Sequence, residues 1–150
     1  MRAARRIVPP GWLLLALLAA VALHRWLPIA RVLRPPATWL GVALLGSGVA
    51  LALSGIAAFL RAGTPIIPFK RSTLLVTGGV YRFTRNPMYL GFALVLAGTA
   101  VLLGSIGAFL PLPLFVWIIQ RGYIGEEERF LEEIFGSDYA QYKNRVRRWL

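Results

Sequence analysis

The sequence predicts an all-α integral membrane protein with about four transmembrane helices, the last two a short hairpin, and a C-terminal amphipathic helix at the membrane interface. Three observations support this fold class. Of the 150 residues, 57% are hydrophobic and only 15% are charged, a balance unusual for a soluble domain. The apolar residues gather in three long stretches, and every acidic residue lies near the C-terminus. The chain is short enough to form a single domain, residues 1–150.

The first apolar stretch predicts a helix over residues 12–30. His24 and Arg25 interrupt it close enough to its end to reach the interface by snorkelling. The preceding segment, MRAARRIVPP, is basic and could mimic the start of a signal peptide. No clear small-residue cleavage site comes before the next stretch, so we expect a retained helix.

The second stretch, Thr38 to Leu60, has 23 residues without a charge. At 1.5 Å per residue, a helix over 38–60 is long enough to cross a hydrocarbon layer of about 30 Å. Small residues recur in it at intervals of four and predict a surface for close helix packing, which would also permit a dimer while leaving the oligomeric state open. They are Gly46, Ala50, Ser54 and Ala58.

The third stretch, Met88 to Gln120, decides the predicted topology. Its 33 residues are too many for one ordinary spanning helix and too few for two full-length helices and a turn. A tight hairpin broken near Gly104 and Ser105 resolves this, with helices over 88–103 and 106–120. Pro111 and Pro113 are expected to kink the second of them.

The distribution of basic residues supports four helices. It places 14 basic residues on one side of the membrane and 3 on the other, whereas three helices would leave the six basic residues of the tail on the wrong side. The excess predicts a multi-pass protein, of the cell (inner) membrane, with both termini in the cytoplasm. The net charge of +11 is therefore attributed to topology and contact with anionic lipids, not to nucleic acid. The same role is assigned to Arg61, Lys70, Arg71 and Arg82.

Two residue types limit the chemistry. The chain has no cysteine, which excludes a disulfide framework, a thiolate zinc site and a cysteine nucleophile. Its single histidine, His24, cannot build a histidine-rich metal centre. We therefore expect no metal site.

Two polar segments flank the third apolar stretch. One is GGVYRFTRNPMYLG, residues 78–91, and the other is an amphipathic tail, residues 125–148, interrupted by Gly136. The hairpin is predicted to bring both to one cytoplasmic interface. The tail holds all six acidic residues within thirteen positions, and these form either a solvated face that pairs with loop arginines or part of a site for a cationic ligand. They are Glu126, Glu127, Glu128, Glu132, Glu133 and Asp138.

The two segments together resemble the signatures of a membrane methyltransferase family that includes isoprenylcysteine carboxyl methyltransferases and phospholipid N-methyltransferases. The first resembles G-x-Y-x-x-x-R-H/N-P-x-Y, and EERFLEEIFGSDYAQYKNRVRR resembles the second, E-E, then a leucine, F-G-x-x-Y-x-x-Y and a basic residue. The resemblance covers about residues 64–148. It implies that S-adenosylmethionine binds between the motifs and that a lipid-side tunnel admits the acceptor. Asn86 stands where the isoprenylcysteine enzymes usually carry histidine, which weakens the substrate assignment more than the cofactor assignment.

If this cofactor binds, the polar residues have natural partners on it. Arg85 is expected to hold the carboxylate through a bidentate pair, which lysine cannot reproduce. Glu127 or Glu128 would accept hydrogen bonds from the ammonium or the ribose hydroxyls, and Asn86 can both donate and accept. The predicted catalytic residues are Arg85, Asn86 and Glu127, and the first two, with both glutamates, are also assigned to cofactor binding.

Three further residues complete the predicted cofactor site. Tyr81 and Tyr89 would stack on adenine or lie beside the sulfonium in a cation–π contact. Pro87 restricts the residue before it to an extended conformation and suits the first turn of a helix, whose free N–H groups attract anionic atoms. Each also has a purely structural interpretation, the tyrosines as part of an aromatic belt, Pro87 as a helix start and Arg85 as a headgroup anchor.

The predicted reaction is methyl transfer to a lipophilic or lipidated acceptor, with most of the acceleration coming from positioning and exclusion of water. A carboxylate acceptor needs no base, whereas an amine must lose a proton. Because no histidine is available in the two motifs, a carboxylate, a thiolate or an already neutral nucleophile is favoured. The alternative is a non-catalytic membrane subunit or assembly factor. A transporter is disfavoured because the later predicted spans hold almost no polar groups near their midpoints.

Overall fold

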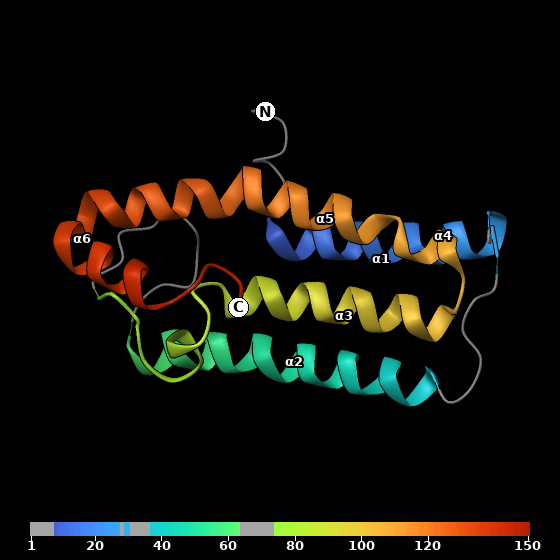
Figure 1. Ribbon diagram of the computed structural model, residues 1–150, viewed down its shortest axis with the longest axis horizontal. Coiled ribbons are helices and arrows are strands. Elements are labelled where there is room, and N and C mark those ends of the chain that lie inside the picture. The colour runs from blue at the N-terminus through green and yellow to red at the C-terminus, as the bar shows by residue number, and fades with distance from the viewer. Residues whose placement is uncertain (1–7, 28, 31–36, 64–73) are drawn as a thin grey trace.

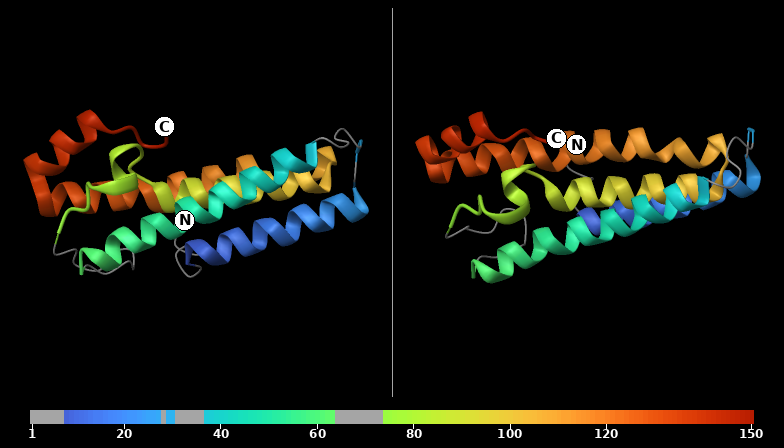
Figure 2. Two further views of the ribbon diagram at one scale, coloured as in Figure 1. Left: turned by 90° about the horizontal axis from the view of Figure 1, so that it is seen from below. Right: turned by 60° about the horizontal axis from the view of Figure 1, so that its bottom comes forward.

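The computed structural model describes residues 8–27, 29–30, 37–63 and 74–150, and over these ranges the chain is helical with no β-strand (Figure 1). The all-α fold class is thereby confirmed. The helices lie side by side in an elongated bundle, and α6 extends beyond one end of it (Figures 1 and 2).

Helix α1 runs over Pro9–Trp26, a shorter span at its C-terminal end than the 12–30 predicted from the sequence. Pro9 occupies the first turn, where a missing N–H costs no hydrogen bond. The helix stops because the proline at position 28 disfavours helical conformation at Leu27, whose φ and ψ are −139° and 64°. Ile29 has a φ of 53°, which is not a helical conformation.

Helix α2, Ala37–Arg61, packs along α3, Pro87–Leu103, through glycines spaced seven residues apart. A β-carbon added to Gly48 would lie 2.6 Å from the carbonyl oxygen of Gly91, and one added to Gly98 would lie 2.6 Å from the Leu45 nitrogen. Two backbones can approach this closely only when the side chain is a hydrogen atom.

The small-residue stripe predicted for this packing lies on the wrong face. Gly46 and Ala50 are exposed, and nothing described lies within 4 Å of a β-carbon built on Gly46. The surface that meets α3 instead consists of Gly41, Gly48, Ala52 and Gly55. Both sets have helical spacing, so the sequence pattern alone did not distinguish them.

We expect Gly91→Leu to lower the free energy of unfolding by about 2–3 kcal/mol, because its side chain would meet the backbone of α2 at Gly48 and Ala52. Gly46→Leu is the matched control, since it gains the same helix propensity in open space. Thermal or denaturant unfolding in detergent would compare them. Equal stability of the two variants would contradict the packing described here.

The chain reverses after α3 at a short, well-defined break. Gly104 ends the helix in the left-handed conformation, with φ 71°, and its N–H bonds to the Ala100 carbonyl. Helix α4 occupies Ile106–Phe109 and α5 begins at Pro111 and ends at Ile119, with Leu110 between them. Two contacts hold this turn, a 2.9 Å bond between His24 Nδ1 of α1 and Ser105 Oγ, and a 3.0 Å bond from the Ile106 N–H to the carbonyl of Ala30, which lies beyond the end of α1.

Helix α5 continues through one π-helical turn, η3 (Gln120–Ile124), into α6, Gly125–Arg145. Within α6, Gly136 takes φ 49° and ψ −117°, which folds the last part back so that Lys143 pairs with Glu132. The helix ends at Arg145, whereas the predicted tail ran to 148, and Val146 is extended. Tyr139, Tyr142 and Val146 then pack into a small cluster of their own.

Among the described residues, two helical runs are long and apolar enough to cross a membrane, judged by length and composition. One is α2, and the other is the continuous run Ile106–Arg145, whose apolar part ends at Ile119. Helix α3 is a shorter apolar helix. The number of membrane passes and the interfacial position of α6 stay predictions.

Candidate functional site

Three segments far apart in the sequence meet at one end of the bundle. They are the motif segment from η2 (Gly79–Arg82) to the first turn of α3, the first turn of α6, and the C-terminal tail after Arg145. The tail returns past η2 toward the beginning of α3 (Figures 1 and 2). The two sequence motifs are therefore in contact, and the tail joins them.

Tyr89 and Glu127 link the two motifs directly. The Tyr89 hydroxyl donates a 2.6 Å hydrogen bond to Glu127 Oε1. Tyr89 lies in the first turn of α3 and is buried in the bundle core. Glu127 lies in the first turn of α6, beyond the apolar part of α5. Burial raises the pKa of the Glu127 carboxyl, the bond from Tyr89 lowers it, and the neighbouring Glu128 charge raises it, so that the net shift is upward.

Glu128 is a buried carboxylate shared by two arginines. Arg148 approaches it in a bidentate arrangement, with Nε 3.0 Å from Oε1 and Nη2 2.6 Å from Oε2. Arg85 Nη2 lies 3.2 Å from Oε1 of the same group. Glu128 is 7% exposed, and the Arg85 side chain is 9% exposed. Two arginine side chains therefore share the single carboxylate of Glu128. The hydrogen bonds between Arg148 and Glu128 raise the pKa of the Arg148 guanidinium.

Asn86 and its neighbours bind the backbone of the tail. The Asn86 Nδ2 donates to the Arg148 carbonyl at 2.9 Å, the Thr84 hydroxyl donates to the same oxygen at 3.2 Å, and the Arg85 N–H donates to the Arg147 carbonyl at 3.0 Å. The Asn86 side chain makes no capping bond to α3, which begins at Pro87. One donor of the Asn86 amide is therefore already used within the protein.

Tyr81, in η2 of the motif segment, is buried, with 4% of its surface exposed. Its ring lies edge-on to that of Phe59 at a centroid distance of 5.5 Å. Its carbonyl accepts a 2.8 Å hydrogen bond from the Tyr142 hydroxyl. Burial, with the nearby Tyr142 and Glu127, raises the pKa of the Tyr81 hydroxyl.

Three buried polar atoms in the described part of the chain lack a hydrogen-bond partner, and all belong to predicted site residues. They are the Tyr81 hydroxyl oxygen, Arg85 Nε and Arg85 Nη1. Buried donors are almost always paired in proteins, so their concentration at one place marks it as a site that a ligand can complete.

Sequence reasoning missed three residues of this cluster, Thr84, Tyr142 and Arg148. The doubled arginine 147–148 was assigned to a headgroup-bound helix, and nothing in the spacing indicates that this segment is extended and turns back. Tyr142 is the second tyrosine of the F-G-x-x-Y-x-x-Y signature, but it was not assigned to the site. Their role depends on the turn at Gly136, where φ is positive.

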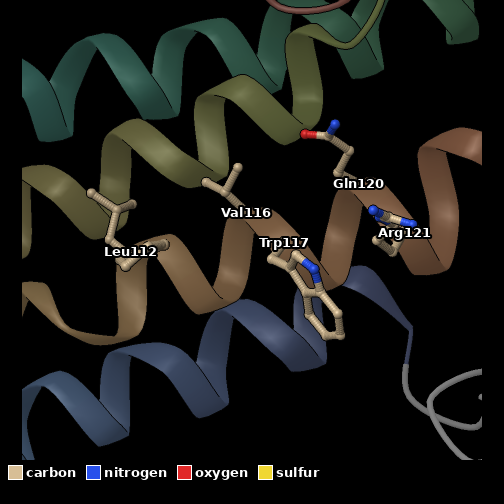
Figure 3. Close-up of a pocket in the computed structure, with 6 residues that line it drawn as sticks. Leu112, Val116, Trp117, Gln120 and Arg121 are labelled. Carbon is tan, nitrogen blue, oxygen red and sulfur yellow. The ribbon is translucent and has the colours of Figure 1, made fainter.

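A groove of about 450 Å³ lies along α5, away from the charged cluster. Apolar side chains line most of it, and its polar end is formed by Gln120 and Arg121 of η3. Figure 3 shows Val116 and Gln120 on the side of α3 and Trp117 on the side of α1. The polar end points along the helix toward the first turn of α6, where Glu127 and Glu128 lie. The residues that line the groove are Leu112, Pro113, Val116, Trp117, Gln120 and Arg121.

The fold and the cluster define a helical protein with helices apolar enough to cross a membrane and with buried side chains of both charge signs at one end. The chain belongs to the phospholipid methyltransferase family, whose model matches residues 36–138. The family suggested by the two motifs is thereby confirmed.

Several relatives are protein-S-isoprenylcysteine O-methyltransferases. The Schizosaccharomyces pombe protein is 39% identical over 83 residues, which cover 54% of this chain and 35% of that protein. Protein-S-isoprenylcysteine O-methyltransferase B of Arabidopsis thaliana is 32% identical over 108 residues, covering 71% and 55%. The human protein is 40% identical over 72 residues, covering 48% and 25%. The chain thus spans about half or less of these relatives, and no solved structure gives a significant match.

Proposed function

We propose that this protein transfers a methyl group from S-adenosylmethionine to a lipophilic or lipidated acceptor at the cytoplasmic face of a membrane. The observation that carries this proposal is the buried Arg85 guanidinium, which has two nitrogens, Nε and Nη1, without a hydrogen-bond partner within a cluster that also holds Glu127 and Glu128. The names of the relatives support the reaction class.

The residues present fit this cofactor. Its carboxylate matches the Arg85 guanidinium, whose open Nε and Nη1 can each donate a charge-assisted hydrogen bond to an anionic oxygen. Its ammonium or ribose hydroxyls match Glu127, which has one oxygen engaged by Tyr89. Glu128 is the weaker candidate for direct contact, because both of its oxygens already bind arginines. Of the two glutamates, Glu127 is therefore the proposed ligand.

The other motif residues shape the site. The Tyr81 hydroxyl is a further open donor, and its ring and that of Tyr89 offer aromatic surfaces for adenine or the sulfonium. Asn86 retains its carbonyl oxygen as an acceptor, while its amide holds the tail in place. Pro87 sets the start of α3 and so the direction in which Tyr89 points.

The bound cofactor would supply an electrophilic methyl group. The chain's own contribution is to hold the acceptor in line with that methyl and to keep water away, because charge is dispersed as the methyl moves. No histidine lies in the described cluster, and the Glu127 carboxylate, whose pKa is raised, is already bonded to Tyr89. This donor set favours an acceptor that needs no proton removed, such as a carboxylate.

The α5 groove is the proposed place for the acceptor's apolar chain. It is apolar along Leu112, Val116 and Trp117 and ends at Gln120 and Arg121, so a long hydrocarbon with a polar or anionic head would match its lining. The helix that carries the groove also carries Glu127. A head group at its polar end would therefore approach the cofactor site along the same helix.

The proposed membrane arrangement has four passes, α1, α2, α3 and α4 with α5, in the cell membrane. Both termini and the charged cluster then lie at the cytoplasmic face, with α6 at the interface. The distribution of basic residues supports this orientation, and so does the position of the cluster at the end of the bundle that is closed by α6. The basic residues of that face would contact anionic lipids.

Two measurements test the proposed function. Calorimetry on the purified protein in detergent should detect S-adenosylmethionine binding, and labelled methyl groups should pass to a component of total lipid or lipidated-peptide extracts. Binding without transfer to any acceptor would favour the non-catalytic subunit or assembly factor. Absence of binding would contradict the cofactor and the enzyme together.

A further inference from the structure

Arg148 occupies an unusual place beside the Arg85 and Glu128 pair. Its side chain is 37% exposed, yet its guanidinium reaches in and engages both oxygens of the buried Glu128. Arg85 therefore makes only one contact with this carboxylate, through Nη2. Its Nε and Nη1 remain open.

The charges explain why this arrangement is useful. One carboxylate shared by two guanidinium groups leaves an excess of positive charge in a poorly hydrated place. The attraction of this excess charge for an anionic ligand is stronger there than in water. Without Arg148, Glu128 is free to swing toward Arg85 and form the bidentate pair that the two groups prefer. Arg85 would then be neutralised, and one of its two open donors would be covered.

We propose that Arg148 is a positioning residue, which limits Glu128 to its single contact with Arg85 so that the rest of the Arg85 guanidinium can bind the carboxylate of the cofactor; it has this role only if the proposed function holds. Arg148 touches no part of the ligand. It acts through Glu128, and its loss should weaken only those ligands that carry a carboxylate.

The tail is held by contacts that a substitution of the Arg148 side chain does not remove. Asn86 and Thr84 bind its carbonyl, Arg85 binds the carbonyl of Arg147, and the ring of Trp149 packs against the bundle core. Arg148→Ala therefore removes one guanidinium while the tail stays attached. Arg147→Ala is the matched control, because it removes the same charge from an exposed neighbour and keeps the carbonyl that binds Arg85.

The test is titration of each protein with S-adenosylmethionine and with its decarboxylated analogue, which keeps the sulfonium and an ammonium but lacks the carboxylate. In Arg148→Ala, we expect affinity for S-adenosylmethionine to fall about tenfold or more, the size of a lost hydrogen bond to a charged group. Affinity for the analogue should change less than about twofold. Arg148→Lys should recover part of the loss, since it restores the charge but not the fork, and Arg147→Ala should behave as wild type.

Each other result overturns the proposal. Equal losses for both ligands in Arg148→Ala would mean that the residue only stabilises the tail, and unchanged affinity for both would mean that Glu128 needs no second partner. Thermal unfolding of the same samples identifies a variant that has simply lost its fold, and in that case the pair Arg148→Lys and Arg147→Ala decides. Wild-type protein that binds neither ligand overturns the proposed function first, which distinguishes the two failures.

Discussion

Arg85→Ala is expected to reduce affinity for S-adenosylmethionine about a hundredfold and to abolish measurable methyl transfer. The substitution removes the buried guanidinium whose open Nε and Nη1 carry the proposed function, and hydrogen bonds from these two charged donors are together worth about 3 kcal/mol, roughly a hundredfold in affinity. Arg85→Lys should recover little, because a single ammonium on a flexible stem does not reproduce the fixed, separate donors of a planar guanidinium. Calorimetry and the labelled-methyl assay measure the two effects.

The fold should survive this change. Glu128 keeps its bidentate partner Arg148 when Arg85 is removed, so no buried carboxylate is left unpaired. Arg82→Ala is the matched control, since it deletes the same charge from an exposed position three residues earlier in the same motif. If Arg85→Ala binds the cofactor as well as Arg82→Ala does, the site assignment is wrong even where an activity exists.

Glu127→Gln is expected to reduce affinity for S-adenosylmethionine between tenfold and a hundredfold, because the neutral amide cannot pair with an ammonium. The amide oxygen can still accept the hydrogen bond from Tyr89. The loss of affinity therefore measures the effect of the missing negative charge more than any change in the shape of the site. Glu133→Gln, an exposed position on the same helix, is the control. Similar affinities in these two variants would show that Glu127 does not face the ligand.

The same carboxylate predicts a pH dependence whose sign follows from its environment. Burial raises the pKa of Glu127 above its ordinary value, so protonation on acidification removes its charge at a higher pH than for an exposed glutamate. Affinity for S-adenosylmethionine should therefore have its full value above that raised pKa and should fall as the pH is lowered through it. The bond from Tyr89 favours the charged form, so Tyr89→Phe should move the midpoint of this loss to higher pH. A midpoint that stays in place or moves down would contradict the assignment.

The Glu128 cluster shows how a local charge pattern and a folded site differ. In the sequence, Glu127 and Glu128 are adjacent and equivalent, and either could have been the ligand. In the fold, one points to Tyr89 and the other to two arginines, so their capacity for a further partner differs. Neighbouring residues on a helix point about 100° apart, and only the surrounding elements determine what each one meets.

The tail shows a different limit of sequence reasoning. The sequence predicted an amphipathic helical tail over 125–148 with an interruption at Gly136, and the structure has a helix to Arg145 with non-helical backbone at Gly136. The positive φ of Gly136 and the extended Val146 turn the last residues back onto the motif segment. There the tail contributes the backbone carbonyls of Arg147 and Arg148, which accept from Asn86, Thr84 and the Arg85 N–H. A backbone carbonyl is common to all residues, so the sequence carries no signal for these contacts.

From the sequence alone it follows that this chain is helical and apolar and which family it belongs to, and the sequence also locates the two polar segments that form the proposed site. Composition, the length of apolar stretches and motif spacing are properties of the chain itself, so they can be interpreted without knowledge of the fold. Only the tertiary structure decided which glycine face of α2 meets α3, which glutamate remains available, and that Arg148 completes the cluster. These outcomes depend on contacts between residues distant in the chain, where packing and charge pairing select one arrangement from several that the pattern allows equally.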